Sequence, residues 1–182
     1  RHTLGMGHVP EDRQRQGLVT SMTITENLVL TRYHDSGFCN GFKMKWSSAK
    51  ETAKELVKSY DIRTSDPEQL ASTLSGGNQQ KVVVARELSR DIRLLLAAQP
   101  TRGIDVGSIE YIHEQIVKER DSGTAVLIVS TELDEVTALS DRVLVIYRGK
   151  IVADLDPKKA SHMEIGLYMA GSRPENVAGV NA

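Results

Sequence analysis

Cysteine is almost missing from this sequence, since Cys39 is the only one among its 182 residues. A lone cysteine excludes an internal disulfide and a zinc site built on a cysteine cluster, and it is typical of a cytosolic protein. Aromatic residues are scarce as well, at 4%, although 40% of the residues are apolar. A core of Val, Leu, Ile and Ala is normal for a soluble α/β domain.

Long apolar runs, a secretory signal and a strong net charge are also absent. No run approaches the roughly 20 apolar residues that a membrane-spanning helix needs. The net charge is −1 and the pI is about 6.6, which disfavours DNA or RNA as the main ligand. The length fits one domain, or one domain with a small subdomain.

A P-loop of the form G-x-x-x-x-G-K-[ST] is missing too. The only Gly-Lys pair is Gly149-Lys150, which falls in an expected hairpin turn. The sequence therefore has no loop of this type to cradle the phosphates of a nucleotide. Because it opens at Arg1 and enters a strand at once, we interpret it as a fragment of a longer protein.

Apolar runs alternate with amphipathic segments in much of the chain. The pattern predicts buried strands at residues 5–9, 94–98 and 125–129, helices at 81–90, 107–120, 132–139 and 163–169, and an antiparallel hairpin of residues 142–147 and 150–155. Strands that alternate with helices predict an α/β fold with a mostly parallel sheet, covered by helices on both faces.

The segment between the first two strands has a different, helical character. Residues 13–17 are a charged loop, and residues 35–45 have the composition of an irregular connector. The capping box Ser48-x-x-Glu51 predicts that a helix begins near Ser48. Its apolar face consists of Ala49, Ala53, Leu56, Val57 and Tyr60. Residues 18–73 are therefore expected to form a small helical subdomain.

The stretch Leu74-Ser75-Gly76-Gly77-Asn78-Gln79-Gln80-Lys81 is the most informative motif of the chain. Ser75 can cap a helix, and the two glycines let backbone N–H groups approach an anion. A helix N-terminus has unpaired N–H groups and the positive end of the helix dipole, so phosphate suits it. The alternative is an ordinary helix cap followed by a glycine turn.

The whole octapeptide, followed by Val82-Val83-Val84-Ala85-Arg86, resembles the signature motif of ABC-type ATPases. The phrases His8-Val9-Pro10-Glu11-Asp12-Arg13 and Pro100-Thr101-Arg102-Gly103-Ile104-Asp105-Val106-Gly107 are similar to the C-terminal lobe of the double-domain ATPases that drive bacterial uptake of simple sugars and nucleosides. The resemblance extends from Gly5 to about Gly171. It implies an ABC-type nucleotide-binding domain over residues 1–171, with the helical subdomain at 18–73, the signature helix and α/β core at 74–171, a C-terminal hairpin, and a tail at 172–182.

In that family two lobes stack head to tail, and each ATP lies between the P-loop of one lobe and the signature of the other. The resemblance therefore implies ATP and Mg²⁺ as cofactors, with the metal ligands mainly in the other lobe. It also implies three partners: an N-terminal ATPase lobe of the same protein, an integral membrane permease and an extracytoplasmic substrate-binding protein. The expected location is the cytoplasmic face of the cell membrane.

The resemblance also implies roles for single residues. Those expected to contact a nucleotide are Ser75, Gly76, Gly77, Asn78 and Gln79 of the signature, Asp105 of the D-loop, and Glu11 at the place of the Q-loop glutamine. Asp105 has an alternative role as the N-cap of the next helix.

Four positions depart from the family pattern, and Glu11 at the place of the Q-loop glutamine is one of them. Ala98 replaces the aspartate that helps to hold Mg²⁺, Gln99 replaces the catalytic glutamate, and Thr131 replaces the switch histidine. Alanine offers no ligand oxygen, and glutamine can hydrogen-bond water but cannot take its proton. The lobe's own site is therefore expected to be degenerate, with no confident catalytic residue and no metal ligand.

Two questions stay open at this level. The apolar residues Leu28, Leu30, Phe38, Phe42 and Trp46 either pack the helical subdomain or expose a patch for the permease. The function is either energy coupling in an importer or ATP binding without hydrolysis in a regulatory lobe. A soluble ABC ATPase of translation or repair is a weaker alternative, because such proteins usually keep both acidic residues.

Overall fold

The computed structural model describes residues 4–172. The chain folds into two compact units, Arg1–Val129 and Ser130–Ala182. The tail expected at residues 172–182 lies outside the described residues except for Ser172. The extent of one partial domain over residues 1–171, with a subdomain at 18–73, stays a prediction.

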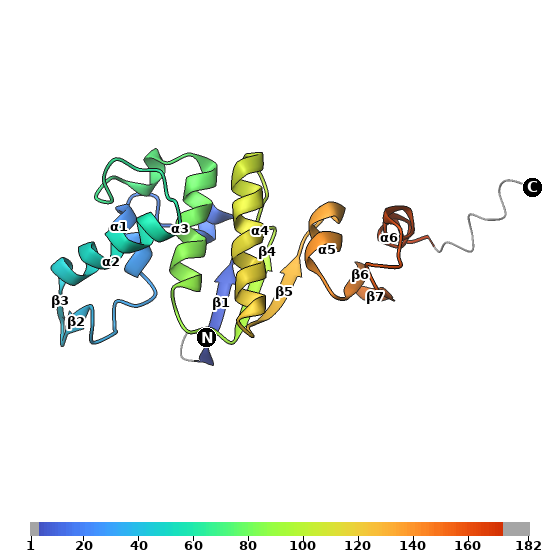
Figure 1. Ribbon diagram of the computed structural model, residues 1–182, viewed down its shortest axis with the longest axis horizontal. Helices are drawn as coiled ribbons and strands as arrows, with labels where there is room; N and C mark the ends of the chain where they lie inside the picture. Colours follow the sequence, from blue (N-terminus) through green and yellow to red (C-terminus); the bar gives the residue numbers. More distant parts are fainter. Residues whose placement is uncertain (1–3, 173–182) are drawn as a thin grey trace, which may run out of the picture. The chain divides into compact units, whose positions relative to one another are not determined.

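The sheet of the first unit consists of three parallel strands in the order β1-β4-β5 (Figure 1). They are β1 (Met6–Val9), β4 (Leu94–Ala98) and β5 (Ala125–Val129). Gly7 is in register with Leu95, and Leu95 with Val126. The predicted strands are confirmed in place and direction.

Two helices, α3 (Gly76–Leu88) and α4 (Val106–Asp121), lie side by side on one face of this sheet (Figure 1). The core beneath them contains Leu95 and Ala97 of β4, together with apolar residues of both helices. The prediction that both faces are covered, with β5 buried, is wrong for the described residues of this unit. Leu127 and Val129 on the opposite face are 54% and 53% exposed, because no described helix of the unit packs over them.

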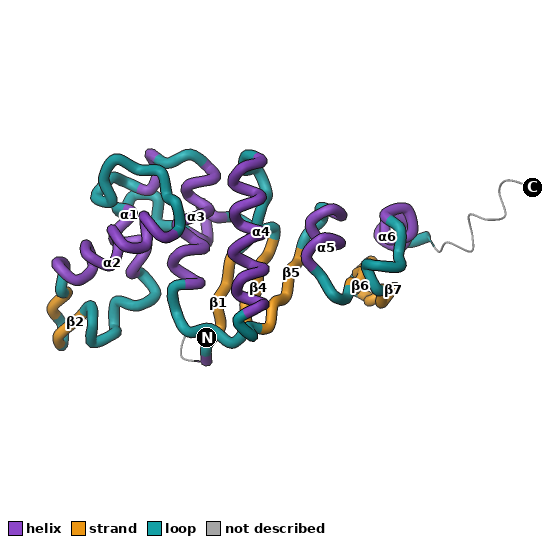
Figure 2. The backbone as a smooth tube through the Cα atoms, viewed as in Figure 1, coloured by secondary structure: helices purple, strands orange, loops and turns teal. Residues whose placement is uncertain are grey.

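The helical region between β1 and α3 begins with a turn of π-helix, Arg13–Gly17, where a loop was expected. It continues with α1 (Ile24–Val29), two short strands, β2 (Cys39–Asn40) and β3 (Lys43–Met44), and α2 (Trp46–Ser59). A 3-10 turn, Ala71–Thr73, precedes α3. Figure 2 shows how much of this region is loop, including the whole connection from α2 to that turn.

The expected start of α2 at Ser48 is wrong by two residues. The helix begins at Trp46 after Lys45, which makes no side-chain cap. The β2–β3 hairpin fixes the entry of the chain, since Lys45 N donates to the Phe38 carbonyl at 2.8 Å and Lys45 Nζ to the Ser36 carbonyl at 2.9 Å. A capping box does occur in this region, but at Thr23 and Glu26 before α1.

The second unit contains α5 (Leu133–Leu139), β6 (Val143–Tyr147), β7 (Lys150–Leu155) and α6 (His162–Met169). Strands β6 and β7 form the predicted antiparallel hairpin. Its turn, Arg148-Gly149, has φ values of 47° and 75°, the left-handed conformation that two-residue hairpin turns favour. Val143, Val145 and Ile165 form a small core.

None of the helices in residues 4–172 is long and apolar enough to cross a membrane.

Candidate functional site

The start of α3 carries the signature motif, and Ser75 caps it as predicted. Ser75 Oγ accepts from Asn78 N at 3.4 Å and from Asn78 Nδ2 at 3.0 Å. Ser75 itself is exposed, and Gly76 is half-buried. The N–H groups of the first helical turn have no partner within the helix, so this end of α3 presents hydrogen-bond donors at the surface.

Neighbouring groups approach both signature glycines closely, but the group nearest to Gly76 is the end of the flexible Arg13 side chain, which can shift. A Cβ placed on Gly76 would lie 2.7 Å from Arg13 Nη2. A Cβ placed on Gly77 would lie 2.2 Å from Ser108 Oγ and 2.7 Å from Asp105 Oδ2. Contacts under 3.0 Å are sterically forbidden for a methyl group, so packing against the start of α4 already requires glycine at position 77.

Asp105 is the N-cap of α4. Its carboxylate accepts from Ser108 N at 3.0 Å and from Ser108 Oγ at 2.8 Å. These hydrogen bonds, that of the hydroxyl above all, hold the pKa of the Asp105 carboxyl below its ordinary value. The alternative role as a helix cap is therefore confirmed, and the closeness of Asp105 to Gly77 brings the start of α4 against the start of α3.

The next two signature residues use their side chains within the chain. Asn78 Oδ1 accepts from Arg63 N at 2.8 Å. Gln79 is buried, donates to the Ala71 carbonyl at 3.2 Å and accepts from Gln14 Nε2 at 3.1 Å. The signature residue most available to a ligand is thus Ser75, together with the backbone of Gly76.

The end of β4 carries two of the departures from the family pattern. Gln99 has φ of 48°, in the left-handed region, and its N–H donates to the Val129 carbonyl at 2.7 Å. Ala98 precedes it and has no side-chain oxygen. In residues 4–172 no group of three or more His, Cys, Asp or Glu side chains is arranged to hold a metal ion. At the end of β4, Ala98 itself offers Mg²⁺ no ligand.

Glu11 and Thr131 belong to different units of the chain. Glu11, which the sequence predicts at the Q-loop position, forms an ion pair with Arg102. Thr131 belongs to the second unit, two residues before α5 begins. The structure of the first unit thus groups Ser75, Gly76, Gly77 and Asp105.

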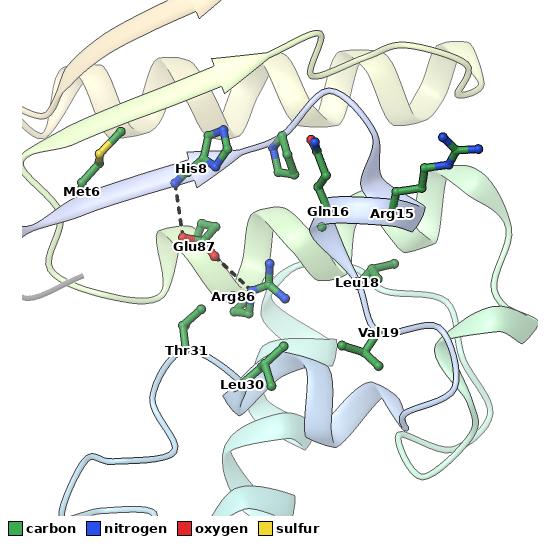
Figure 3. Close-up of a pocket in the computed structure, with 12 residues that line it drawn as sticks. Met6, His8, Arg15, Gln16, Leu18, Val19, Leu30, Thr31, Arg86 and Glu87 are labelled. Carbon is green, nitrogen blue, oxygen red and sulfur yellow. Dashed lines mark hydrogen bonds and ion pairs between the residues drawn. The ribbon is translucent and has the colours of Figure 1, made fainter. Parts of the chain in front are cut away.

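A pocket of about 310 Å³ lies beside β1, between the turn at Arg13–Gly17, the end of α1 and the end of α3 (Figure 3). Sequence reasoning did not identify it. Its wall combines apolar and charged groups: Met6, His8, Pro10, Arg15, Gln16, Gly17, Leu18, Val19, Leu30, Thr31, Arg86 and Glu87.

A buried ion network forms one side of this pocket. Glu87, 3% exposed at its side chain, accepts from Arg86 Nε at 3.0 Å, Arg90 Nη2 at 2.8 Å and His8 N at 3.2 Å. Arg86 is 6% exposed at its side chain, and its Nη1 has no hydrogen-bond partner in the described part of the chain. The charged residues 86 and 87 at the end of the otherwise apolar run of α3, with Arg90 just after the helix, were the available sequence signal.

The apolar residues of the helical region divide between the two roles considered. Leu28 and Phe38 are buried. Leu30 lines the pocket, whereas Phe42 is fully exposed and Trp46 is 46% exposed. Part of the set therefore packs the interior, and part is available at the surface.

Comparison with known proteins gives consistent results. The profile of the ABC transporter family matches residues 3–102. A guanosine import ATP-binding protein, NupO of Bacillus subtilis, is 43% identical over 177 residues, which are 97% of this chain and 35% of that protein. A nucleoside import ATP-binding protein, NupA of Lactococcus lactis, is 45% identical over 166 residues, 91% of this chain and 33% of that protein. A ribose import ATP-binding protein, RbsA of Shouchella clausii, is 40% identical over 169 residues, 92% and 33% of the two chains. The chain thus spans about a third of the length of these relatives.

Solved structures agree on the fold. A dimeric ATP-binding cassette in a post-hydrolysis state, bound to ADP and Pi, has a TM-score of 0.68 at 24% identity, over 84% of this chain and 62% of that one. The ADP conformation of a cassette of an ABC transporter has a TM-score of 0.64 at 19% identity, over 97% and 68% of the two chains. With the expected α/β fold confirmed and more than half of its residues matched by the family profile, this chain belongs to the ABC transporter family.

Proposed function

We propose that this chain is the signature-bearing part of the C-terminal lobe in a two-lobe ATPase that drives import of a nucleoside or a simple sugar. The observation that carries the proposal is the capped, surface-exposed start of α3, held against Asp105 and Ser108 at the start of α4. The similarity to nucleoside and sugar import proteins over more than nine-tenths of the chain supports the choice of importer.

The proposed task of α3 is to donate hydrogen bonds to the phosphates of an ATP molecule that the P-loop of the other lobe holds. The donor set fits such a ligand, since it consists of the Ser75 hydroxyl and the first backbone N–H groups of the helix. Preorganised donors of this kind stabilise the charge that develops during phosphoryl transfer. Any Mg²⁺ ligands must come from the other lobe.

The chain's own site is proposed to be degenerate, because Ala98, Gln99 and Thr131 lack the oxygen ligand, the general base and the imidazole of a working site. In this proposal Glu11 occupies the Q-loop position, and the ATPase is a peripheral protein at the cytoplasmic face of the membrane.

The pocket beside β1 is the proposed contact for the membrane permease. Its wall is partly apolar and includes a buried guanidinium with an N–H that has no partner in the described part of the chain, and elsewhere in the helical region Phe42 and Trp46 are exposed. Such mixed surfaces suit a protein partner better than a small polar ligand. An extracytoplasmic substrate-binding protein completes the proposed system.

The test is Gly77→Asp in the whole ATPase with its permease. A carboxylate at this position meets Ser108 and Asp105 and opposes an incoming phosphate, so we expect ATP hydrolysis to fall by about 10²-fold or more. The matched control is Gly166→Asp in α6, where an added side chain meets nothing within 4 Å. Near-normal hydrolysis by Gly77→Asp would count against the assigned role.

A second candidate, an ATP-binding lobe that regulates without hydrolysing, is favoured by Ala98 and Gln99. The importer and the regulatory lobe differ in how long the degenerate site keeps its bound nucleotide.

A further inference from the structure

Arg13 joins two segments that lie far apart in the sequence. Its Nη1 donates to the Arg102 carbonyl at 2.8 Å and its Nη2 to the Gly103 carbonyl at 3.2 Å, across 89 and 90 positions of sequence. Residues 102 and 103 lead from the end of β4 to Asp105 and α4. The guanidinium therefore fixes the backbone segment that leads to Asp105.

The same guanidinium touches the signature. A Cβ on Gly76 would lie 2.7 Å from Arg13 Nη2 and 3.4 Å from the Gly103 carbonyl oxygen. The first turn of α3 thus rests against both the cation and one of the carbonyl groups that the cation holds. Three elements, the turn after β1, the segment before α4 and the start of α3, meet at one side chain.

The turn that carries Arg13 is itself fixed. Asp12 Oδ1 accepts from the N–H groups of Gln14 and Arg15, both at 3.0 Å. Gln14 Nε2 donates to Gln79 Oε1 on α3 at 3.1 Å. At the end of the turn, a Cβ on Gly17 would lie 3.0 Å from Val83 of α3. The arginine therefore extends from a base that is already attached to the signature helix.

Packing stability alone does not explain the hydrogen bonds that Arg13 makes. Its Nε is buried and has no hydrogen-bond partner among residues 4–172. A buried N–H without a partner destabilises a folded chain. Only a planar guanidinium offers two parallel donors to two successive carbonyl groups, which a lysine ammonium cannot match. The geometry is specific for arginine despite that unpaired N–H.

We propose that Arg13 is a positioning residue for the signature site. It fixes residues 102 and 103 against the first turn of α3, and so sets the relative positions of the Gly76 backbone, Gly77 and Asp105. The proposal rests on the proposed function, since it assumes that these groups act on a nucleotide held by the facing lobe. Arg13 itself does not have to touch that nucleotide.

The kinetic test uses Arg13→Gln and Arg13→Lys in the whole ATPase with its permease. Displaced donors weaken binding of the transition state more than binding of the substrate. For Arg13→Gln we expect kcat to fall about 10-fold, while the KM for ATP changes less than about 3-fold. Arg13→Lys should recover part of kcat, because one ammonium can still reach one carbonyl.

The second readout is hydrogen–deuterium exchange of the same proteins without nucleotide. We expect the backbone N–H groups at the first turn of α4, Ser108 and Ile109 among them, to exchange roughly 10-fold faster in Arg13→Gln. The control is Arg142→Gln, which also removes two guanidinium hydrogen bonds, but from an exposed pair with Asp154 in the second unit. It should leave both kcat and exchange near the start of α4 unchanged.

The outcomes separate this inference from the function on which it rests. Normal kcat in Arg13→Gln, beside an inactive Gly77→Asp, overturns the role of Arg13 and leaves the signature role standing. A loss of kcat without faster exchange at α4, or an equal loss in Arg142→Gln, also overturns it. Full activity in Gly77→Asp would instead remove the proposed function itself.

Discussion

At the scale of single residues, the structure divides the signature between surface and interior. Ser75 and Gly76 are available at the start of α3, whereas the Gln79 side chain is used to hold Gln14 and Ala71. Gly77 is constrained from within, by Ser108 and Asp105. The motif that the sequence predicts to bind phosphate is thus also the place where three segments of the chain pack together.

Gln99→Glu alone should not create a second working site. The two side chains have almost the same shape, so the left-handed backbone at this position should accept the change, but Ala98 still offers no oxygen for a metal. We expect kcat of the whole ATPase to stay unchanged, measured as phosphate released per protein at saturating ATP. A doubling of kcat by this single substitution would contradict the degenerate-site proposal, and the double variant Ala98→Asp/Gln99→Glu is the comparison.

At the scale of elements, Lys81 links three helices. Its Nζ, on a side chain that is 7% exposed, lies 2.7 Å from Asp61 Oδ2 just after α2, and 4.4 Å from the ring centroid of Tyr111 on α4. The hydrogen bond and the charge of Lys81 lower the pKa of the Asp61 carboxyl. The lysine of the signature octapeptide therefore attaches the helical region to the α/β core.

Lys81→Met should keep the packed volume and lose these polar contacts. We expect a destabilisation of about 1 kcal/mol, because the charged hydrogen bond that is lost has a 60% exposed partner and is screened by water, and a thermal midpoint lower by a few degrees. Because the pKa of Asp61 is depressed in the folded state, its contribution to stability is present at pH above its unfolded pKa. That contribution is lost as the pH falls through the folded pKa. The variant should lack this part of the acid sensitivity, whereas the exposed Lys54→Met should behave like wild type.

The elements also show where sequence reasoning succeeded and where it could not. Residues 94–98 and the hairpin around Arg148-Gly149 were predictable, because short apolar runs and a turn dipeptide are local signals. The start of α2 was not, because contacts of Lys45 with residues 36 and 38 override the Ser48 capping box. The exposure of Leu127 and the contacts of Arg13 depend on which distant segments meet, and a single sequence does not encode that in any local pattern.

At the scale of the whole molecule, the proposed degenerate site would make the two nucleotide sites of the ATPase unequal. One ATP would be held by the other lobe and turned over under the signature of this chain. The second would meet Gln99 instead of a general base, and loss of such a base costs on the order of 10²–10⁴ in rate. Under this proposal the ATPase would hydrolyse one ATP each time the two lobes close and would retain the other ATP between them.

Nucleotide trapping measures this inequality directly. The whole ATPase is loaded with labelled ATP, chased with excess unlabelled ATP through many turnovers, and passed over a desalting column. We expect about one label per two-lobe protein to remain bound, because slow hydrolysis at the degenerate site delays release. Ala98→Asp/Gln99→Glu should shorten that retention, and Gly166→Asp should not. If wild type loses the label within a single turnover, the two sites are equivalent and the proposal of a retained ATP is wrong. That result would leave the proposed role of the signature residues at the other site untouched.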